Sequence, residues 1–352
     1  MESTNIKKPI LVPLFVAFTI LIMVFVLSTT WMHIEQKKHM LYEPVQTLYE
    51  QLRLQQDKEA HTLQTIIKSI SKIEILQKAF IARDREKLLQ ESLPLNNMLA
   101  MNNSITHFYF HDPDRVNFLR VHKPSRHGDL INRQTAKIAV QSGTVSWGIE
   151  LGPLGTMTLR LVMPWQVNGE LIGYLELGME VSNITKLVQK QLDLQLFTFI
   201  NKTHIEHKKW LSGMEMLGFQ SNWDQFQKLV IMIHQGIRLP PGLHTYINSE
   251  NWNKKEPLET LTEGSSEASQ YYYFFSSPLH NISGEIVGRV VAVYDQSTFL
   301  YARRIHTITM ITTVSILSII LALSLYRRLN RVEDRINRDA FLLEPFTLSA
   351  TY

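Results

Sequence analysis

The segment Thr156–Val181 reads TMTLRLVMPWQVNGELIGYLELGMEV, and the prediction of the fold starts from it. It consists of two runs rich in apolar residues with the pair Asn168-Gly169 between them. Asn-Gly between two such runs is a strong signal for a β-hairpin, because both residues adopt the positive φ angles that a tight turn needs. We therefore predict two antiparallel strands, Thr156–Met163 and Leu171–Glu180.

Upstream of this hairpin, short apolar runs alternate with turn residues and predict three more strands. These strands are Ile105–His111, Val116–His122 and Val145–Leu151. Between the second and the third, the composition of Asn132–Ser142 suits a short helix. Five mostly antiparallel strands with helices define an α+β arrangement, which we assign to a first module covering 95–181.

Downstream of the hairpin, the predicted elements loosely repeat this order in a second module, 182–304. A helix is expected at Ser182–Leu192, with the Ser182 hydroxyl as its N-terminal cap. The other predictions are a strand at Leu194–Ile200, helical or mixed segments at His204–Gly218 and Asp224–Ile233, and strands at Gln270–Ser276 and Ile286–Tyr294. We therefore expect two related modules in tandem.

Two apolar segments without Asp, Glu, Lys or Arg flank the modules, at 10–32 and 305–325. A helix of about 20 residues crosses the hydrocarbon core of a bilayer. The alternative for the first segment is a cleaved signal peptide, whose apolar run would be about 7–15 residues long with a small-residue cleavage site. The longer run here ends at Trp31 and Met32, which favours an uncleaved anchor with an interfacial aromatic residue. We predict two transmembrane helices.

Basic residues set the predicted orientation of these helices. Five arginines follow the second apolar segment and two lysines precede the first: Arg327, Arg328, Arg331, Arg335, Arg338, Lys7 and Lys8. The opposite signal comes from four residues on the other side: Lys37, Lys38, Arg303 and Arg304. Large domains are translocated largely regardless of charge, so the short ends count most. We expect the ends 1–9 and 326–352 in the cytoplasm and both modules outside it.

Between the first apolar segment and the first module, apolar residues recur at steps of three and four from Leu41 to Phe80, which predicts an amphipathic helix. We assign it to 33–94 as a long stalk helix, with Pro44 kinking or interrupting it and Pro94 ending it. Its apolar stripe needs a cover. The sequence leaves two options open: the helix packs on its own domain, or two copies of the chain form a dimer stalk.

The composition excludes several functional classes. The 352 residues include 36 Lys and Arg against 32 Asp and Glu, and no cysteine, so disulfides and thiolate chemistry are impossible. No basic stripe carries the interleaved aromatic residues typical of nucleic-acid binding. No dinucleotide, phosphate-loop, zinc-protease or Gly-x-Ser-x-Gly motif occurs. We predict that the chain is not an enzyme and that it uses neither a cofactor nor a metal.

Polar residues lie on strands that should bury one face. Because residues two apart on a strand share a face, Arg160 and Glu176 can meet on one face of the hairpin. One interpretation is a solvated face with cross-strand ion pairs, each worth about 0.2–1 kcal/mol. The other is a concave pocket with apolar walls for a small anion or zwitterion. The candidate ligand-binding residues are Arg120, His122, Trp147, Arg160, Trp165, Tyr174 and Glu176.

The run FYFHDPDRVNFLRVHKPSRHGDLINR at 108–133, followed by GIELGPLGTMTLRLVMPWQVNGELIGYLELGMEV at 148–181, resembles the membrane-distal module of bacterial double Cache sensor domains. These PAS-like extracytoplasmic domains lie between two spanning helices of chemoreceptors, histidine kinases and diguanylate cyclases. The resemblance covers about Gln36–Phe299 and is strongest over Phe108–Val181. It implies a long first helix, two antiparallel-sheet modules and a ligand pocket in the distal one. The amino-acid-sensing signature of some members is not evident.

The resemblance implies an inner-membrane sensor whose periplasmic domain binds an unknown small molecule and signals across the lipid bilayer. We expect a homodimer. Sensors of this family continue into a kinase, cyclase or methyl-accepting domain, whereas this chain ends shortly after its second apolar segment. It would therefore be the truncated sensor half of such a protein, or it would signal through a separate cytoplasmic protein. The alternative from a different class is an envelope scaffold or partner-binding protein without a sensing role.

Overall fold

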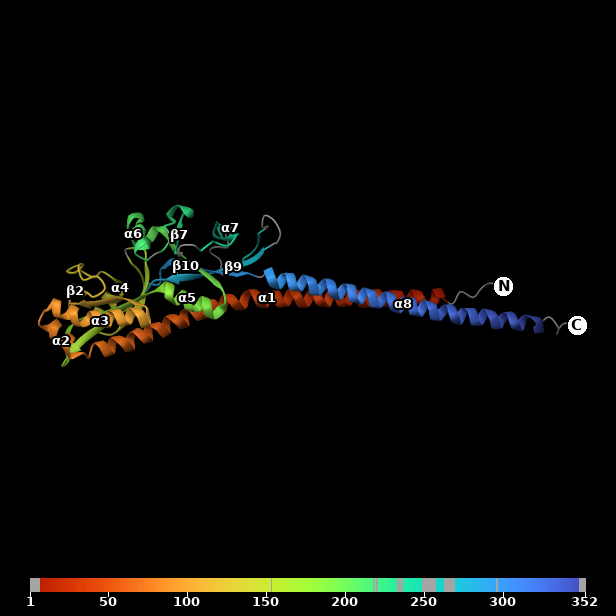
Figure 1. Cartoon of the computed structure of the whole chain (residues 1–352), viewed down its shortest axis with the longest axis horizontal. Helices are drawn as coiled ribbons and strands as arrows, with labels where there is room; N and C mark the ends of the chain where they lie inside the picture. Colours follow the sequence, from red (N-terminus) through yellow and green to blue (C-terminus); the bar gives the residue numbers. More distant parts are fainter. Residues whose placement is uncertain are drawn as a thin grey trace. The chain divides into compact units, whose positions relative to one another are not determined.

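The computed structural model describes residues 7–152, 154–217, 219, 221–232, 237–248, 258–262, 270–295 and 297–347. The chain forms two compact units (Figure 1). One consists of Met1–Met40 together with Gln296–Tyr352, and the other is Leu41–Asp295. Each unit is described by itself below.

The first of these units contains the beginning of helix α1, Lys7–Ile70, and the helix α8, Ser297–Thr347. Within the described residues, two segments are long and apolar enough to cross a membrane, Phe15–Met32 and Arg304–Ile336. Their mean hydropathy values are 2.2 and 2.3, and none of their residues is buried inside the protein. An apolar surface of this length is stable in a lipid environment, which agrees with the predicted spans at 10–32 and 305–325.

In the unit Leu41–Asp295, the helical part that precedes the first sheet differs from the prediction. Instead of one helix over 33–94, there are three: α1, which ends at Ile70, then α2, Glu74–Ile81, and α3, Arg85–Asn103. The backbone of α1 stays helical through Pro44, so that residue does not interrupt it.

The prediction that Pro94 ends a helix is wrong, because Pro94 lies inside α3. Asp84 caps the N-terminus of α3, because its side chain accepts a hydrogen bond of 2.9 Å from the Lys87 backbone N–H. Leu88 and Leu99 anchor α3 in the core on either side of the proline. Capping and burial on both sides hold the helix together across the proline, at which one backbone hydrogen bond is missing.

The first sheet confirms the predicted five-stranded arrangement. Its strands are β1 Ile105–His111, β2 Asn117–Arg120, β3 Ser146–Leu151, β4 Met157–Val167 and β5 Glu170–Glu180. They are antiparallel in the order β2-β1-β5-β4-β3. The predicted hairpin joins β4 and β5, and its turn residues Asn168 and Gly169 have φ angles of 52° and 85°. The predicted short helix is α4, Gln134–Ser142.

Helices α1 to α3 cover one face of the first sheet. Phe108 and Phe110 of β1 point to this side and belong to the same buried apolar cluster as Leu63 and Ile67 of α1. Their neighbour Tyr109 points to the opposite face, because side chains alternate along a strand. One face of the sheet is therefore packed with apolar residues, and the other face carries polar and aromatic residues such as Tyr109.

The second module repeats the topology of the first. Its strands are β6 Gln195–Asn201, β7 Leu229–Met232, β8 Leu258–Thr262, β9 Gln270–His280 and β10 Ile286–Asp295. Their order is β7-β6-β10-β9-β8, which is the order of the first sheet with every strand number raised by five. The helices of this module are α5 Val181–Leu192, η1 Lys202–His204, α6 His207–Leu217, η2 Trp223–Gln225 and α7 Leu243–Asn248.

Two details of the second module differ from the prediction. The segment Asp224–Ile233 was expected to be helical or mixed, yet its described part ends in strand β7, whose residues Leu229, Val230 and Ile231 are buried. Ser182 does not cap α5, since the helix begins one residue earlier and its N-cap residue is Glu180. Strand β8 and helix α7 had no counterpart in the prediction.

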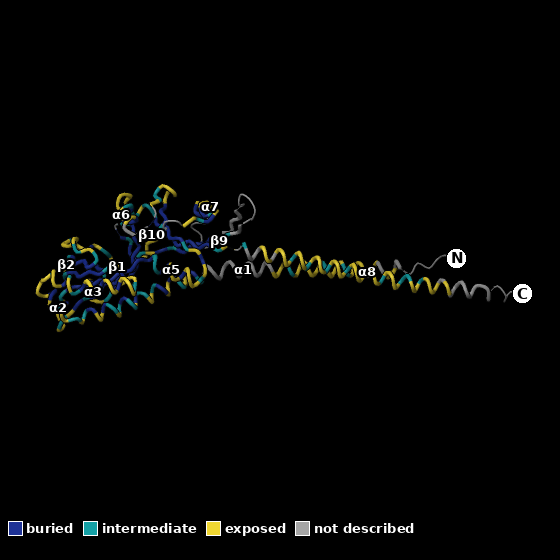
Figure 2. The backbone as a smooth tube through the Cα atoms, in the orientation of Figure 1, coloured by how far each residue is buried: buried dark blue, intermediate teal, exposed yellow. Residues whose placement is uncertain are grey.

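The two modules share one apolar core and are joined at the edge of the first sheet. The backbone N–H of Ile282, in the turn between β9 and β10, donates a hydrogen bond of 2.9 Å to the Ile149 carbonyl of β3. Gly148 makes this approach possible, because a Cβ atom there would lie 2.7 Å from the Ile282 Cβ. Figure 2 shows that, where burial is described, the strands of both sheets are largely buried.

Candidate functional site

A cavity of about 650 Å³ lies on the face of the first sheet that faces away from helices α1 to α3. Its floor is formed by strand residues, and its wall comes from the loop between β2 and α4. The side chains that carry chemistry in its lining are Thr106, His107, Tyr109, Arg120, His122, Lys123, Arg126, Asp129, Asn132, Arg133, Thr156, Arg160 and Glu180.

A fully buried carboxylate organises the floor of this cavity. Glu176 accepts hydrogen bonds from Arg160 Nη1 at 2.6 Å and from Arg133 Nη2 at 2.8 Å, and it lies 2.9 Å from His111 Nε2. Burial opposes its ionisation, but the two guanidinium groups outweigh burial and hold the pKa of Glu176 well below its usual value. The carboxylate therefore stays charged and fixes both arginines in place.

A second carboxyl group lies beside the same two arginines. Glu150 Oε1 accepts a hydrogen bond of 2.7 Å from the backbone N–H of Thr135, in the first turn of α4. Its Oε2 atom lies 3.8 Å from Arg133 Nε and 3.9 Å from Arg160 Nε, which is too long for direct hydrogen bonds. Burial raises the pKa of Glu150. The two arginines therefore keep N–H groups that their carboxylate neighbours do not fully use.

The third arginine fixes the loop that forms the wall. Arg120 donates to both carboxylate oxygens of Asp129 at 2.6 Å and to the Arg126 carbonyl at 2.7 Å. Although burial opposes the charge, the hydrogen bonds that Arg120 donates to Asp129 raise the pKa of Arg120. Three guanidinium groups surround the buried Tyr109 ring, with centroid distances of 5.4 Å for Arg120, 5.0 Å for Arg133 and 5.9 Å for Arg160. A bidentate pair of a guanidinium group and a carboxylate, such as Arg120 and Asp129, is rigid, so the cavity is preformed.

Neutral and titrating groups complete the floor. Burial lowers the pKa of His107 well below its usual value and lowers that of His122 to about 4, so both imidazoles are neutral near pH 7. Burial also raises the pKa of Glu180 to about 7, although Arg160 acts in the opposite direction. Glu180 Oε1 lies 3.7 Å from His107 Nδ1. Glu180 can therefore present either a carboxylate or a carboxylic acid to the cavity.

The charges of the cavity do not cancel. Five basic side chains line it, and four carboxyl groups either line it or lie directly behind the lining, namely Asp129, Glu180, Glu176 and Glu150. Burial shifts two of the four, Glu180 and Glu150, towards the neutral form. The net potential is therefore positive, which favours an anionic occupant.

The structure brings together some of the sequence-predicted site residues and separates others. Arg120, His122 and Arg160 line the cavity, and Glu176 lies beneath it. The expected meeting of Arg160 and Glu176 is confirmed, on a buried face instead of a solvated one.

The three aromatic residues among the predicted ligand-binding residues, Trp147, Trp165 and Tyr174, do not line the cavity. Trp165 belongs to the core on the other face, with its ring centroid 5.1 Å from that of Phe80 and its Nε1 donating to the Ser71 carbonyl. Tyr174 packs in a small cluster with residues of α4. Trp147 is on edge strand β3 and is 41% exposed.

Sequence reasoning missed several side chains of the cavity, among them His107, Tyr109, Arg133 and Glu180. A signal for the first two was present, since His107, Tyr109 and His111 are two residues apart and therefore share a face of β1. Arg133 and Glu180 carried no such signal. The β2–α4 loop brings Arg133 to Glu176, although the two residues are far apart in sequence. Glu180 is the last residue of β5, and the sequence pattern did not indicate that this strand end lies at a cavity.

Comparison with known proteins gives one family match and several structural similarities. Residues 35–227, more than half of the chain, match the family described as a double sensory domain of two-component sensor kinases. The chain is similar to the periplasmic domain of Vibrio cholerae LuxQ, with 12% identity, coverage of 71% of this chain and 98% of that chain, and a TM-score of 0.45.

Two further sensor domains give comparable results. The V. cholerae histidine kinase DctB sensor domain shares 15% identity, with 71% and 98% of the two chains covered and a TM-score of 0.34. The E. coli DcuS sensor domain shares 17% identity over 39% of this chain and 98% of that chain, with a TM-score of 0.33. No curated protein sequence matches the chain.

Proposed function

Because the chain belongs to the double Cache family, the double sensory domains of two-component sensor kinases, we propose that it is an inner-membrane sensor that binds a small organic anion in its first module. Its modules would lie in the periplasm, held by the two apolar helices, with both chain ends in the cytoplasm. Binding would be signalled across the membrane through α8. Homologous domains of this family are sensory and not catalytic, in keeping with a receptor.

The observation that carries the proposal is the cationic cavity above the buried cluster of Arg133, Arg160 and Glu176. A volume of about 650 Å³ falls within the usual range of small-molecule sites, about 300–1,000 Å³. Lys123 and Arg126 are at its mouth, where long basic side chains attract an incoming anion. Carboxylate or phosphate groups match the remaining N–H groups of the arginines, while Glu180 and the neutral histidines offer hydrogen bonds to hydroxyl groups.

A bound anion would signal only if it has different affinities for two arrangements of the module. The ligand would contact the β2–α4 loop through Arg126 and the sheet through Arg160, so it would tighten the loop onto the sheet. Arg133 lines the cavity and lies 3.8 Å from Glu150, which belongs to β3, the strand whose Ile149 carbonyl accepts the Ile282 hydrogen bond. A change at β3 would thereby reach the second module and, along the chain, α8.

Thermal unfolding of the full chain in lipid nanodiscs tests this proposal. The probes are acetate, lactate, succinate and citrate as anions, glycine betaine as a zwitterion and putrescine as a cation. A ligand at 100 times its Kd adds about 2.7 kcal/mol to the unfolding free energy. For a domain of this size, that corresponds to a Tm increase of roughly 5–10 °C. We expect such an increase with at least one anion and none with putrescine.

Neutralising the mouth of the cavity provides the matched test. The double substitution Lys123→Gln and Arg126→Gln should weaken binding of that anion about tenfold, mainly through slower association. Lys72→Gln removes an equally exposed charge outside the cavity and should change nothing. A panel without any stabilising anion, or equal loss in both variants, would favour the alternative of a scaffold or partner-binding protein. The homodimer and the separate cytoplasmic signalling partner stay predictions.

A further inference from the structure

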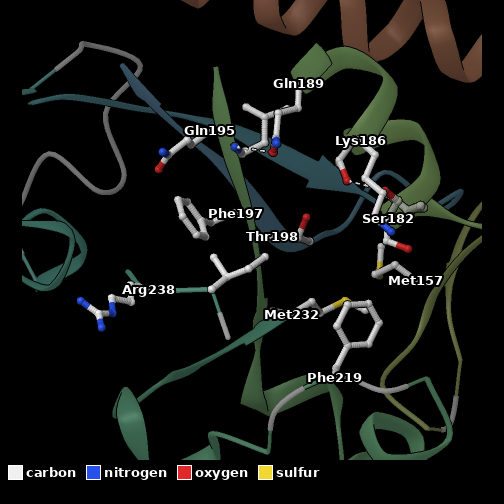
Figure 3. A pocket seen from close by; sticks show the side chains of 14 residues that line it. Met157, Ser182, Lys186, Gln189, Gln195, Phe197, Thr198, Phe219, Met232 and Arg238 are labelled. Atoms are coloured by element: carbon white, nitrogen blue, oxygen red, sulfur yellow. Dashed lines mark hydrogen bonds between the residues drawn. The ribbon is translucent and has the colours of Figure 1, made fainter. Parts of the chain in front are cut away.

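The second module contains a cavity of its own, of about 410 Å³ (Figure 3). It lies between α5, the beginning of β6, the end of β7 and the segment around Ile237 and Arg238. Its lining consists of Met157, Val181, Ser182, Thr185, Lys186, Gln189, Gln195, Leu196, Phe197, Thr198, Phe219, Met232, Ile237 and Arg238. None of these residues lines the cavity of the first module.

This cavity is not the topological counterpart of the first one. The corresponding face of the second sheet is filled by a packed cluster that includes Phe199, Phe274, Val291 and Tyr246 of α7. The cavity lies instead where α5 meets β6. Gln189 Oε1 accepts a hydrogen bond of 3.1 Å from the Leu196 backbone N–H, and Figure 3 shows this link at the edge of the hollow. The link ties α5 to the sheet, so the cavity is preformed.

The lining separates apolar and cationic parts. Met157, Val181 and Phe219 are buried and, together with Met232, form an apolar floor. Two basic side chains lie at its rim, Lys186 on α5 and Arg238 across the opening, and Arg238 extends outward in Figure 3. Ser182 and Thr198 contribute hydroxyl groups. No Asp or Glu occurs among the fourteen described residues of the lining.

From this separation we propose a second binding site in the second module, specific for an amphipathic organic anion with a short apolar tail, such as a monocarboxylate of medium chain length. The tail would lie on the methionine and phenylalanine floor, and the carboxylate would face Lys186 with the hydroxyl of Ser182 or Thr198 nearby. A strongly polar anion gains nothing from this floor, so the two cavities of the chain would select different ligands.

The two cavities are lined by residues that are adjacent in sequence, at the start of β4 and at the junction of β5 and α5. Thr156 and Glu180 line the first cavity, while their neighbours Met157 and Val181 line the second. Neighbouring residues of an extended chain point to opposite sides. An occupant of the second cavity would therefore act on the ends of β4 and β5, which also carry the floor of the first.

Isothermal titration of the full chain in nanodiscs of zwitterionic lipid tests the second site, with hexanoate as the probe and empty nanodiscs as the blank. Each methylene group that is buried should improve affinity about fourfold, so hexanoate should bind at least about tenfold more tightly than butyrate. Hexanamide has the same tail without the charge and should bind at least about fivefold more weakly than hexanoate. Heat that matches the blank would overturn the proposal.

Three variants locate the site. Lys186→Gln should weaken hexanoate binding about fivefold to tenfold. Lys190→Gln removes a charge from the same exposed side of α5 outside the cavity and should leave the affinity unchanged. Arg126→Gln, in the first cavity, should also leave it unchanged. Equal loss in the two α5 variants would show attraction by net charge alone, and loss in Arg126→Gln would place hexanoate in the first cavity; either result contradicts the second site.

Discussion

The two modules have the same strand order, yet they use the equivalent face of the sheet in opposite ways. In the first module this face carries Glu176, Arg160 and their partners around an open cavity. In the second it carries Phe199, Phe274 and Val291, packed against α7. One topology therefore supports a charged, ligand-sized hollow or a closed apolar core, depending on which residues alternate along its central strands.

Because of this difference, the two modules are stabilised by different interactions. The first module keeps charged groups buried, and their stability depends on every partner being present. The second module depends on apolar burial and close packing, which are insensitive to pH. Substitutions that remove a charge should therefore affect the first module strongly, and substitutions that remove volume should affect the second by the usual amount for a core.

The largest effect is expected from Glu176→Gln. The substitution leaves the buried guanidinium groups of Arg133 and Arg160 without their main counter-charge, so the unfolding free energy should fall by about 3–5 kcal/mol. Urea denaturation of the full chain in nanodiscs, followed by tryptophan fluorescence, measures the loss. Glu170→Gln on the same strand is exposed and serves as the control. Equal small losses for both would mean that the cluster does not stabilise the module.

Glu180→Gln should have the next largest effect, and its size should depend on pH. The carboxyl pKa is about 7 in the folded chain against an ordinary value of 4.5. As pH rises from 4.5 to 7 the unfolded chain releases its proton first, so the folded state loses roughly 3 kcal/mol that does not return above that range. Glu180→Gln should therefore stabilise the chain by up to this amount near pH 8 and by little near pH 4.5.

His122 provides the opposite sign for the same experiment. Burial lowers the pKa of His122 from 6.5 to about 4, so the contribution of this residue to stability should fall as pH decreases through this range. His122→Asn should remove this contribution and leave the opposite slope of Glu180, which falls with rising pH between about 4.5 and 7. Unfolding midpoints measured across the range from about pH 4 to pH 8 separate the two groups. Because the two slopes oppose each other between about pH 4.5 and pH 6.5, the stability of the wild type should change little there. A His122→Asn variant whose stability does not fall with rising pH would contradict the Glu180 assignment, and a Glu180→Gln variant whose stability does not fall with decreasing pH would contradict the His122 assignment.

A smaller effect is expected at the junction of the modules. Gly148→Ala places a Cβ atom 2.7 Å from the Ile282 Cβ, closer than real contacts allow. We expect a loss of about 1–3 kcal/mol, since the β9–β10 turn must move away from β3. Gly143→Ala is an imperfect control because of its positive φ, so Ser142→Ala, exposed and near β3 in sequence, is the better one.

The smallest effect is expected in the packed core of the second module. Phe274 is fully buried, and Phe274→Leu retains an apolar side chain while removing part of its volume. The unfolding free energy should fall by about 1–1.5 kcal/mol, with the same value at acidic and alkaline pH. A pH-dependent loss would show that charged groups also stabilise this face and would weaken the contrast between the modules.

The sequence predicted what depends on neighbouring residues. Asn168-Gly169 located the β4–β5 hairpin, and alternation placed Arg160 and Glu176 together. It could not predict which face the helices α1 to α3 cover, because Trp165 and Arg160 lie on opposite faces of the same strand, β4, and both of these faces carry apolar residues. The same limit applies to Arg133, which the β2–α4 loop carries to Glu176 across 43 positions of sequence.

The hydrogen bond between Ile282 and Ile149 connects the edge of the first sheet directly to the turn before β10. From the turn residue Ile282, the chain runs through a single strand, β10, before α8 begins at Ser297. Because an extended strand can hardly be stretched, a displacement of the N-terminal end of β10 also moves its C-terminal end. A displacement at the edge of the first sheet would therefore reach the start of α8 through β10 alone.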